Sequence, residues 1–408
     1  MRILFIVPYV PTRIRVRPYS LLETLAGRGH KITLATLWSD EAERGQLATL
    51  EEMGLKTLAV RLPRLRSVKN CLGVLPSSTP LQAVYCWQPQ LKQALDNLLD
   101  TEPFDVIHVE HLRGAGYGLA LKDKGVPIVW DSVDCISYLF EQAMVHSRSL
   151  FGKWMTRLEL GRTRHYEGWL VKQFAKVLVT SKIDKEALLQ LAKREDQSTL
   201  NNNYSEIENQ IMVLPNGVDQ TIFTPNGHKA IGETLVFSGK MSYHANITMA
   251  LHLVQDIMPH VWAERPGVQI NIVGKDPPAL IQALGQDPRV TVTGYVPDLQ
   301  PYLQQATVAV APAAYGAGIQ NKVLEAMACG TPVVATKQAT AALNLQPDQD
   351  ILLADTTETF ARQVLKLLDN SDLCHEVGTN GYNYVTQTHN WFRIGSTLEQ
   401  LYQSITNG

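Results

Sequence analysis

A lysine and a glutamate three residues apart are the side chains of this 408-residue chain best suited to bind a charged ligand. Lys322 and Glu325 lie in a predicted helix between short apolar strands at 308–310 and 333–335, and they share one helix face. Gly318 opens that helix in a glycine turn, whose unpaired N–H groups suit a phosphate. A cation for phosphate beside a carboxylate for ribose hydroxyls predicts a nucleotide-linked substrate. The alternative is an ordinary core helix, because its remaining side chains are largely apolar.

A second glycine and lysine follow an earlier strand of the same half. Gly239 and Lys240 come directly after the predicted strand Leu235–Ser238. Glycine permits close approach of the backbone, and the lysine can reach a phosphate. The pair therefore predicts a second contact to a diphosphate, and a surface lysine with no role is the alternative.

Polar residues also end a strand in the first half of the chain. His108, Glu110 and His111 alternate at the end of the predicted strand Val106–Val109, where functional groups tend to lie in parallel sheets. We expect His108 to pack within the strand, and Glu110 or His111 to face a ligand. Arg113 is a further candidate for an acceptor anion, or is simply solvated.

The next strand ends in two aspartates. Asp131 and Asp134 follow the predicted strand Ile128–Trp130, and one of them is expected to cap a helix while Asp134 could hold an acceptor hydroxyl. Ser181 and Asp184, further on, have the spacing of a capping box. The predicted catalytic set is therefore His111, Glu110 and Asp134.

Three arginines lie in the loop after the first strand. Arg13, Arg15 and Arg17 could bind a phosphate of the acceptor or of the donor, because guanidinium groups make bidentate phosphate contacts. Solvated charge is the alternative.

The elements that must position these residues alternate between strand and helix. Continuous apolar runs indicate strands covered on both faces, which is typical of parallel sheets with helices on each side. The expected strands of the first half are Ile3–Val7, Ile32–Thr36, Val106–Val109, Ile128–Trp130 and Val177–Thr180. Those of the second half are Leu235–Ser238, Gln269–Val273, Val290–Thr293, Val308–Val310, Val333–Ala335 and Ile351–Leu353. The polar stretch 194–209 is predicted to be a surface loop, and Asn216-Gly217 a left-handed turn between the halves.

Composition narrows the class of protein. The net charge of −2 gives no field that would attract nucleic acid, and 45% hydrophobic residues can bury large cores. The five cysteines lack metal-site spacing and fit a reducing compartment. The apolar start, MRILFIVPYV, is better explained as a buried strand than as a signal peptide. No apolar run reaches the length of a membrane span. We therefore expect a cytoplasmic protein, with at most a peripheral contact at the inner face of the membrane.

Several motifs resemble one known family. The run KVLEAMACGTPVVAT is similar to the donor helix of the GT-B glycosyltransferases of retaining family four, and PNGVD and GKMSYHANITMAL resemble further segments of it. The resemblance implies that Glu325 binds the ribose of a nucleotide sugar. The family's usual second glutamate is Ala317 here, as in a sub-branch with a Gly-x-x-x-Lys sequence. Lys240 matches a family arginine, the following basic position is absent, and Lys322 is the candidate replacement.

The resemblance implies a GT-B fold: two doubly wound Rossmann-like α/β domains facing a deep cleft. Residues 1–216 would bind the acceptor and residues 217–389 the nucleotide sugar, with helix 390–408 crossing back to the first domain. The implied donor-binding residues are Gly239, Lys240, Gly318, Asn321, Lys322 and Glu325. The implied reaction is transfer of a sugar from a nucleotide-diphosphate donor, by family frequency a UDP-sugar, with retention and without a metal or cofactor.

The acceptor stays open among a lipid-linked sugar, a glycolipid and a small metabolite. A basic run at residues 61–69 and an aromatic-basic stretch at 148–176 could rest on an anionic membrane, although amphipathic helices packed on the domain are the alternative. Two other functions compete with sugar transfer: a non-catalytic GT-B scaffold, and a dinucleotide-dependent oxidoreductase. The oxidoreductase would need a G-x-G-x-x-G turn after an early strand, and none follows Ile3–Val7.

Overall fold

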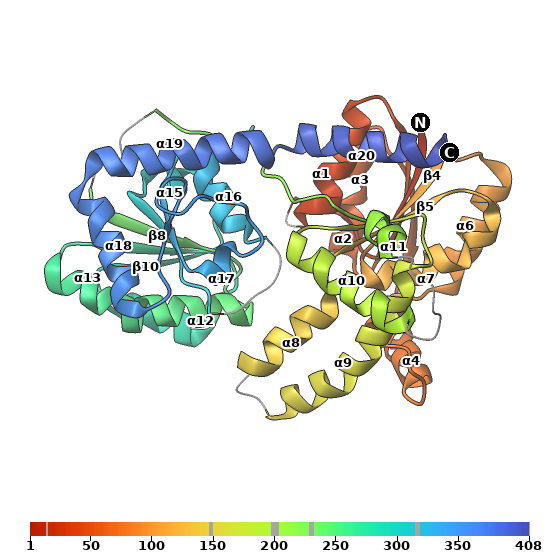
Figure 1. Cartoon of the computed structure of the whole chain (residues 1–408), viewed down its shortest axis with the longest axis horizontal. Coiled ribbons are helices and arrows are strands. Elements are labelled where there is room, and N and C mark those ends of the chain that lie inside the picture. The colour runs from red at the N-terminus through yellow and green to blue at the C-terminus, as the bar shows by residue number, and fades with distance from the viewer. Residues whose placement is uncertain (14, 147–149, 197–203, 228–231, 315–318, 408) are drawn as a thin grey trace. The chain divides into compact units, whose positions relative to one another are not determined.

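The structure is a computed structural model, and it describes residues 1–13, 15–146, 150–196, 204–227, 232–314 and 319–407 (Figure 1). The chain divides into two compact units. Unit 1 comprises Met1–Pro215 with Trp391–Gly408, and unit 2 comprises Asn216–Asn390. Each is described by itself.

Unit 1 is built on a parallel sheet of seven strands in the order β3-β2-β1-β4-β5-β6-β7. The strands are β1 Arg2–Val7, β2 Lys31–Trp38, β3 Lys56–Arg61, β4 Val106–Glu110, β5 Ile128–Val133, β6 Lys176–Val179 and β7 Ile211–Val213. The helices are α1 Val16–Gly27, α2 Glu41–Gly45, α3 Leu47–Glu52, α4 Arg64–Val74, α5 Leu81–Tyr85, α6 Pro89–Thr101, α7 His111–Ala120, α8 Ile136–His146, α9 Leu150–Val171, α10 Lys182–Asp196, α11 Tyr204–Gln210 and α20 Trp391–Thr406.

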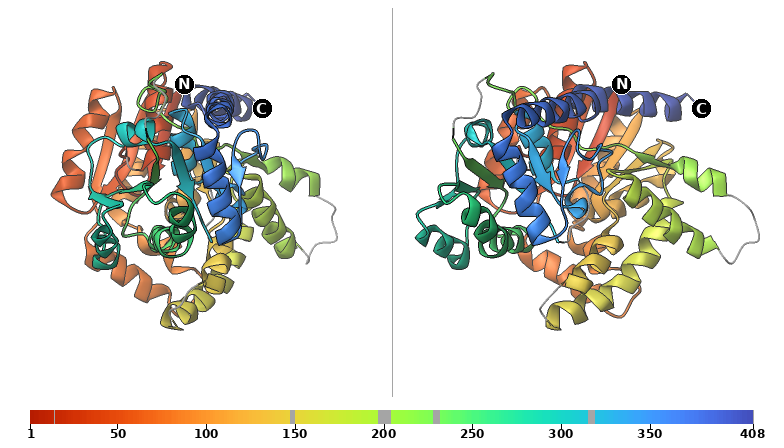
Figure 2. Two further views of the ribbon diagram at one scale, coloured as in Figure 1. Left: turned by 90° about the vertical axis from the view of Figure 1, so that its left-hand side faces the viewer. Right: turned by 60° about the vertical axis from the view of Figure 1, so that its left-hand side comes forward.

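The apolar run of β1 shows why a doubly covered sheet needs continuous hydrophobic strands. Ile3 and Phe5 point into one core, together with residues of α1 and α20, whereas Leu4 and Ile6 point into the core on the opposite face. Successive side chains of a strand leave on opposite faces, so a strand covered on both faces is mostly apolar along its whole length. Helix α20, the last of the chain, packs against α1 (Figures 1 and 2).

Unit 2 repeats this plan with a parallel sheet of six strands in the order β10-β9-β8-β11-β12-β13. The strands are β8 Thr234–Ser238, β9 Gln269–Val273, β10 Val290–Gly294, β11 Val308–Ala311, β12 Val333–Ala335 and β13 Leu352–Leu353. The helices are α12 His244–His252, α13 Met258–Glu264, α14 Ala279–Gln282, α15 Gln300–Gln305, α16 Asn321–Ala328, α17 Lys337–Thr340, α18 Thr357–Asp369 and α19 Ser371–Thr388. One turn of π-helix, Leu253–Ile257, joins α12 to α13.

The two sheets confirm the predicted pair of doubly wound α/β layers, and three local expectations were wrong. Strand β3 was missed, because this edge strand is only half-buried and its sequence is not a continuous apolar run. Residues 182–196 and 204–210, parts of which were expected to be loop, are helical, and 197–203 lie outside the described residues. Neither Asn216 nor Gly217 has a positive φ, so the predicted left-handed turn is absent there. Instead Asn216 and Val218 pair with His389, next to both unit boundaries.

Candidate functional site

Each sheet reverses its winding direction at one point, and ligands of open parallel sheets bind beside the carboxyl ends of the strands at such a point. In unit 1 the reversal lies between β1 and β4, and in unit 2 between β8 and β11. Glu110 ends β4 and His111 follows it, and Gly239 and Lys240 follow β8. The loop after β11 leads to Lys322 and Glu325 in α16. The topology therefore brings the predicted residues of each half to the binding edge of its own sheet.

In unit 2, the turn after β8 requires two glycines. Gly239 has φ +150°, and a Cβ there would lie 2.7 Å from Asn246 Nδ2. Gly274, after β9, has φ +156°, and a Cβ there would lie 1.7 Å from the carbonyl oxygen of Gly239. No larger residue fits either position without displacing its neighbour. The two glycines therefore let the turns after β8 and β9 pack closely against each other and against Asn246.

Asn246 ties this turn to the candidate donor helix. Its Nδ2 donates to the carbonyl oxygen of Lys240 at 3.0 Å, and its Oδ1 accepts from Lys322 Nζ at 2.6 Å. Nothing in the sequence marks Asn246 as a partner of Lys322, which is 76 residues away. The structure gives it a positioning role, because it fixes where the Lys322 ammonium lies.

The Lys322 ammonium is largely enclosed. Its Nζ lies 4.7 Å from the centroid of the Phe237 ring, within cation–π range. Burial lowers the pKa of Lys322 to about 8, and Glu325 opposes that shift. Such an ammonium carries its charge at neutral pH and gains stability from any anion that replaces lost water.

Glu325 lies one turn further along α16 and shows the converse shift. Burial raises the pKa of this carboxyl to about 7, and Lys322 opposes the rise. No ion pair joins the two side chains among the described residues, and each acts on the pKa of the other through its charge. Asn321 begins α16, and its Oδ1 atom is buried and has no hydrogen-bond partner among the residues that the structure describes. Lys240 is exposed, and Gly318 and Ala317 lie outside the described residues.

In unit 1, β4 runs into α7 with no intervening loop. His111 is therefore held at φ +63°, a conformation that is uncommon outside glycine. Its Nδ1 accepts from the backbone N–H of Arg113 at 3.3 Å, so the neutral ring carries its proton on Nε2. Burial, followed by the charge of Arg113, lowers the pKa of His111 to about 4. His111 is thus a neutral donor at physiological pH.

Glu110 is enclosed at the end of β4. The phenol of Tyr9 donates to its Oε1 at 2.6 Å, and its Oε2 is buried without a partner among the described residues. Burial, followed by repulsion from Asp131, raises the pKa of Glu110 to about 8. A protonated carboxyl at neutral pH can donate a hydrogen bond or exchange a proton.

Asp134 is turned toward the end of β6. Its Oδ1 accepts from the hydroxyl of Thr180 at 3.1 Å, and burial, followed by Asp184, raises its pKa to about 6. The preceding Val133 has φ +69°, an outlier for a β-branched residue. Strain of this kind at the ends of both β4 and β5 accords with a functional edge.

Arg17 and Asp131 form a buried ion pair rather than a phosphate site and a helix cap. Arg17 Nε donates to Asp131 Oδ2 at 2.8 Å, and Arg17 also donates to the carbonyl oxygen of Leu214. Burial alone would raise the pKa of Asp131, but Arg17 and His108 together outweigh it and the pKa is lowered. Phosphate binding by Arg17 therefore does not fit its position.

The other two loop arginines are exposed. Arg15 pairs with Glu43 at 3.2 Å and stacks on the ring of Tyr9, whereas Arg13 lies near the Tyr19 hydroxyl. They remain candidates for anion contacts.

Two expected structural roles are confirmed, one with a different partner. His108 packs within β4, stacked on Phe5 and hydrogen-bonded to Tyr402 at 2.7 Å. Ser181 caps α10 by accepting from the N–H of Asp184, but the carboxylate of Asp184 accepts from the N–H of Cys135 instead of completing a capping box.

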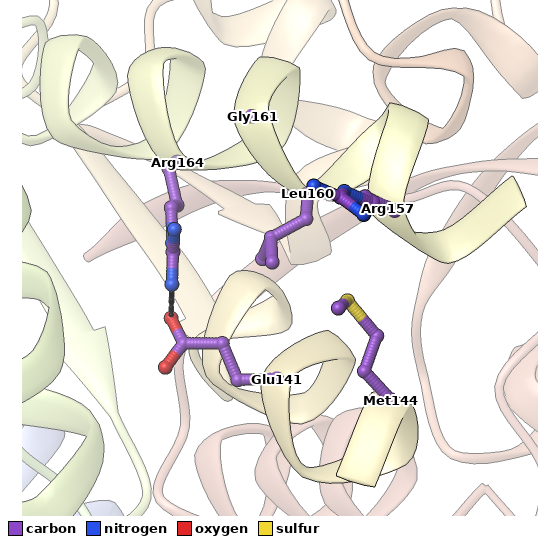
Figure 3. Close-up of a pocket in the computed structure, with 6 residues that line it drawn as sticks. All are labelled: Glu141, Met144, Arg157, Leu160, Gly161 and Arg164. Atoms are coloured by element: carbon purple, nitrogen blue, oxygen red, sulfur yellow. Dashed lines mark hydrogen bonds and ion pairs between the residues drawn. The ribbon is translucent and has the colours of Figure 1, made fainter. Parts of the chain in front are cut away.

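A pocket between α8 and α9 contains none of these residues. It is lined by Glu141, Met144, Arg157, Leu160, Gly161 and Arg164, and the Glu141–Arg164 ion pair, at 2.7 Å, bridges the two helices (Figure 3). It belongs to a helical hairpin and not to the sheet edge.

Comparisons with known proteins agree with this arrangement. Residues 14–202 match the model of the glycosyl transferase 4-like domain, and residues 232–370 match that of the glycosyl transferases group 1. The MMP alpha-(1->4)-mannosyltransferase of Mycolicibacterium hassiacum is 24% identical over 316 residues, 74% of this chain and 70% of that relative. Two other curated relatives are matched over only 24% and 37% of their length.

Solved structures share the whole fold. Sucrose-phosphate synthase from Thermosynechococcus elongatus has a TM-score of 0.70 at 18% identity, covering 99% of both chains. Anabaena Alr3699/HepE, in complex with UDP and glucose, has a TM-score of 0.68 at 15% identity, covering 99% of this chain and 100% of that one. The chain is therefore a glycosyltransferase of the GT-B fold, in which a glycosyl transferase 4-like domain precedes a group 1 domain.

Proposed function

We propose that the protein transfers a sugar from a nucleoside diphosphate donor to an acceptor hydroxyl, with retention of anomeric configuration and without a metal ion. The observation that carries the proposal is the Lys322 ammonium, which Asn246 holds beside the glycine turn after β8 at the binding edge of unit 2. The carboxyl of Glu325 follows one turn along the same helix.

The donor diphosphate would bind Lys322 and the backbone beside Gly239, and Lys240 would add a second cation. No described side chain caps the N-terminus of α16, and the N–H groups of Asn321 and Lys322 would also face the anion, whereas that of Val323 donates to the carbonyl oxygen of Gln320. Glu325 would accept hydrogen bonds from the ribose hydroxyls. UDP is the nucleotide we favour, because Alr3699/HepE, which shares the fold, is described in complex with UDP.

In the reaction, the acceptor oxygen bonds to the anomeric carbon while the bond from that carbon to the diphosphate oxygen breaks. Negative charge grows on the leaving diphosphate, which takes up the acceptor proton on the same face of the sugar. Lys322, Lys240 and the start of α16 would stabilise that charge, as preorganised dipoles and cations do. We propose a reaction without a metal ion because these groups supply the positive charge that a metal ion would otherwise provide to the leaving diphosphate.

Unit 1 would bind the acceptor. The Nε2–H of His111 can donate to a sugar or acceptor oxygen, and protonated Glu110 can donate from the same edge. Asp134 is the weaker candidate, since Thr180 already occupies its Oδ1. Acceptors of all three expected classes, a lipid-linked sugar, a glycolipid and a small metabolite, offer the hydroxyl that this chemistry needs. A peripheral contact with the inner face of a membrane belongs to the same proposal.

Titration of the purified protein with UDP and UDP-sugars in a calorimeter tests the donor site. We expect saturable binding to wild-type protein and release of UDP from a donor sugar, slowly to water and faster to an acceptor. Binding without turnover for every donor and acceptor would favour the non-catalytic scaffold, and no binding of any nucleotide would overturn the proposal.

A further inference from the structure

Helix α4 presents an apolar stripe to solvent. Leu65, Val68 and Leu72 are exposed by 83%, 54% and 60%, and Leu75, directly after the helix, by 46%. Their spacing of three, four and three residues places them on one side of the helix. Scattered apolar residues on a surface need no explanation, but a continuous stripe of large aliphatic side chains does.

The other side of α4 is fixed to unit 1. Ser67 is buried, and Asn70 Nδ2 donates to the carbonyl oxygens of Val84 at 3.0 Å and Trp87 at 2.7 Å. Arg162 of α9 donates to the carbonyl oxygen of Leu75. These contacts hold the helix with its apolar stripe outward, because rotation would break the two amide hydrogen bonds.

The surroundings of the stripe are positively charged. Arg61, Arg64 and Lys69 are exposed, and no Asp or Glu occurs in the sequence between Met53 and Leu95. Glu159, which reaches this region from α9, is buried: its carboxylate accepts from the N–H of Leu81 and pairs with Arg162. It therefore does not neutralise the exposed basic groups.

We propose that α4 is a membrane-docking helix, whose leucine and valine side chains insert among the lipids of an anionic bilayer while Arg61, Arg64 and Lys69 bind the headgroups. An apolar stripe with flanking basic residues is the combination that interfacial helices use. Leu65 stands out from the surface, which suits insertion into a fluid layer. A second copy of the chain is a poor occupant, because pairing α4 with α4 would bring like charges together.

Docking of this kind is peripheral. No helix in the described part of the chain is long and apolar enough to cross a membrane. Each inserted side chain and each headgroup contact adds a modest, reversible gain, so binding should depend on lipid charge and on salt. The docking does not require sugar transfer and is tested without any nucleotide.

The experiment is flotation of the full-length protein with vesicles of phosphatidylcholine alone, or with about one third phosphatidylglycerol. The wild-type protein should float with the anionic vesicles, should not float with the neutral ones, and should be released by high salt. L65S/L72S and R64E/K69E should each bind the anionic vesicles at least about tenfold less. Both alter exposed side chains, so the melting temperature should stay that of the wild type.

The matched control is L280S/Y295S, which removes two exposed apolar side chains of unit 2, at 47% and 71% exposure. It should bind vesicles like the wild type. Equal binding of the wild type to neutral and anionic vesicles, or unchanged binding by L65S/L72S, would overturn the proposal. So would binding to an acidic polypeptide such as polyglutamate with no binding to either vesicle, because that result would make the partner a protein.

Discussion

At the scale of single residues, the candidate donor site depends on Lys322, a lysine that is buried and yet positively charged at neutral pH. The enclosure that lowers the pKa of Lys322 also concentrates its positive charge, because little water competes with an anion there. Asn246 orients the ammonium through a hydrogen bond to its Oδ1. This arrangement makes Lys322 the residue whose loss should cost the most donor affinity.

Replacing Lys322 by alanine should weaken UDP binding by about 10- to 100-fold, the range expected for a lost charge-assisted hydrogen bond. Calorimetric titration measures the dissociation constant directly. The matched control is Lys337→Ala in the same unit, since Lys337 is exposed and pairs only loosely with Asp355 at 3.4 Å. An unchanged dissociation constant in folded K322A would contradict the placement of the diphosphate.

The same residue predicts a pH dependence of donor binding. A bound diphosphate favours protonated Lys322, whose pKa in the free protein is about 8. UDP affinity should therefore fall as the pH rises above about 8, by up to roughly tenfold per pH unit until the pKa of the complex is reached. Lys322→Arg keeps its positive charge over this pH range, so its UDP affinity should not decrease above pH 8. A parallel decline in wild type and K322R would assign the effect to another group.

Glu110 predicts a pH dependence of stability. The unfolded chain releases this proton near the ordinary pKa of 4.5, whereas the folded protein keeps it until about pH 8. Between these values the folded state binds more protons, so its stability falls as the pH rises. Glu110→Gln should be less sensitive and exceed the wild type by roughly 2 to 4 kcal/mol above pH 8, with little difference below about pH 4.5. Urea unfolding at a series of pH values measures this difference. If Glu110 were already ionised in the folded protein, the free energy of unfolding would change with pH equally in the wild type and in Glu110→Gln.

At the scale of elements, two strand ends in unit 2 have a close backbone approach that glycine alone permits. The turns after β8 and β9 meet where Gly274 faces the carbonyl oxygen of Gly239. This contact aligns the turn that bears Lys240 with the helix that bears Lys322, through Asn246. The donor site is therefore a property of three elements and not of one motif.

Gly274→Ala should disrupt this alignment. A Cβ 1.7 Å from a carbonyl oxygen, at φ +156°, forces the two turns apart and should cost at least about 3 kcal/mol of unfolding free energy. Chemical denaturation and UDP titration should both report the damage. Gly267→Ala is the control, because no atom lies within 4 Å of its Cβ position and its φ is ordinary. Equal stability of the two variants would show that the turns can separate without cost.

At the scale of the whole molecule, the last helix of the chain packs into the same core as its first strand and first helix. Helix α20 packs on α1, and Ile394, Leu398 and Tyr402 join the core that β1 starts. Tyr402 also donates to or accepts from His108 Nδ1, across 294 residues of sequence. His108 in turn lies 3.6 Å from Asp131, the partner of Arg17, so the last helix is joined to the buried polar residues of β4 and β5.

Tyr402→Phe should therefore destabilise unit 1 although it removes only a hydroxyl. It leaves His108 Nδ1 without its buried partner, a loss of about 1 to 2 kcal/mol. Thermal unfolding would measure it, with Tyr295→Phe as the control, because Tyr295 is 71% exposed. If the two variants had the same melting temperature, the Tyr402–His108 contact would contribute nothing to folding.

The sequence by itself determined the two layered sheets and most of the residues at their edges. Continuous apolar strands separated by helices leave few alternatives to a doubly wound sheet, and strand ends such as Glu110 and Gly239 can be located from the pattern alone. Locally encoded features, such as the cap that Ser181 provides to α10, were likewise predictable.

Only the tertiary structure decided which charged groups form buried pairs and which stay at the surface. Arg17 looks like its neighbours Arg13 and Arg15 in the sequence, yet it alone meets Asp131 in the interior, 114 residues away. Asn246, Gly274 and Tyr402 acquire their roles in the same way, from partners distant in the chain. Spacing along a chain fixes a side chain's face and burial, but hydrogen-bond partners depend on how separate elements pack.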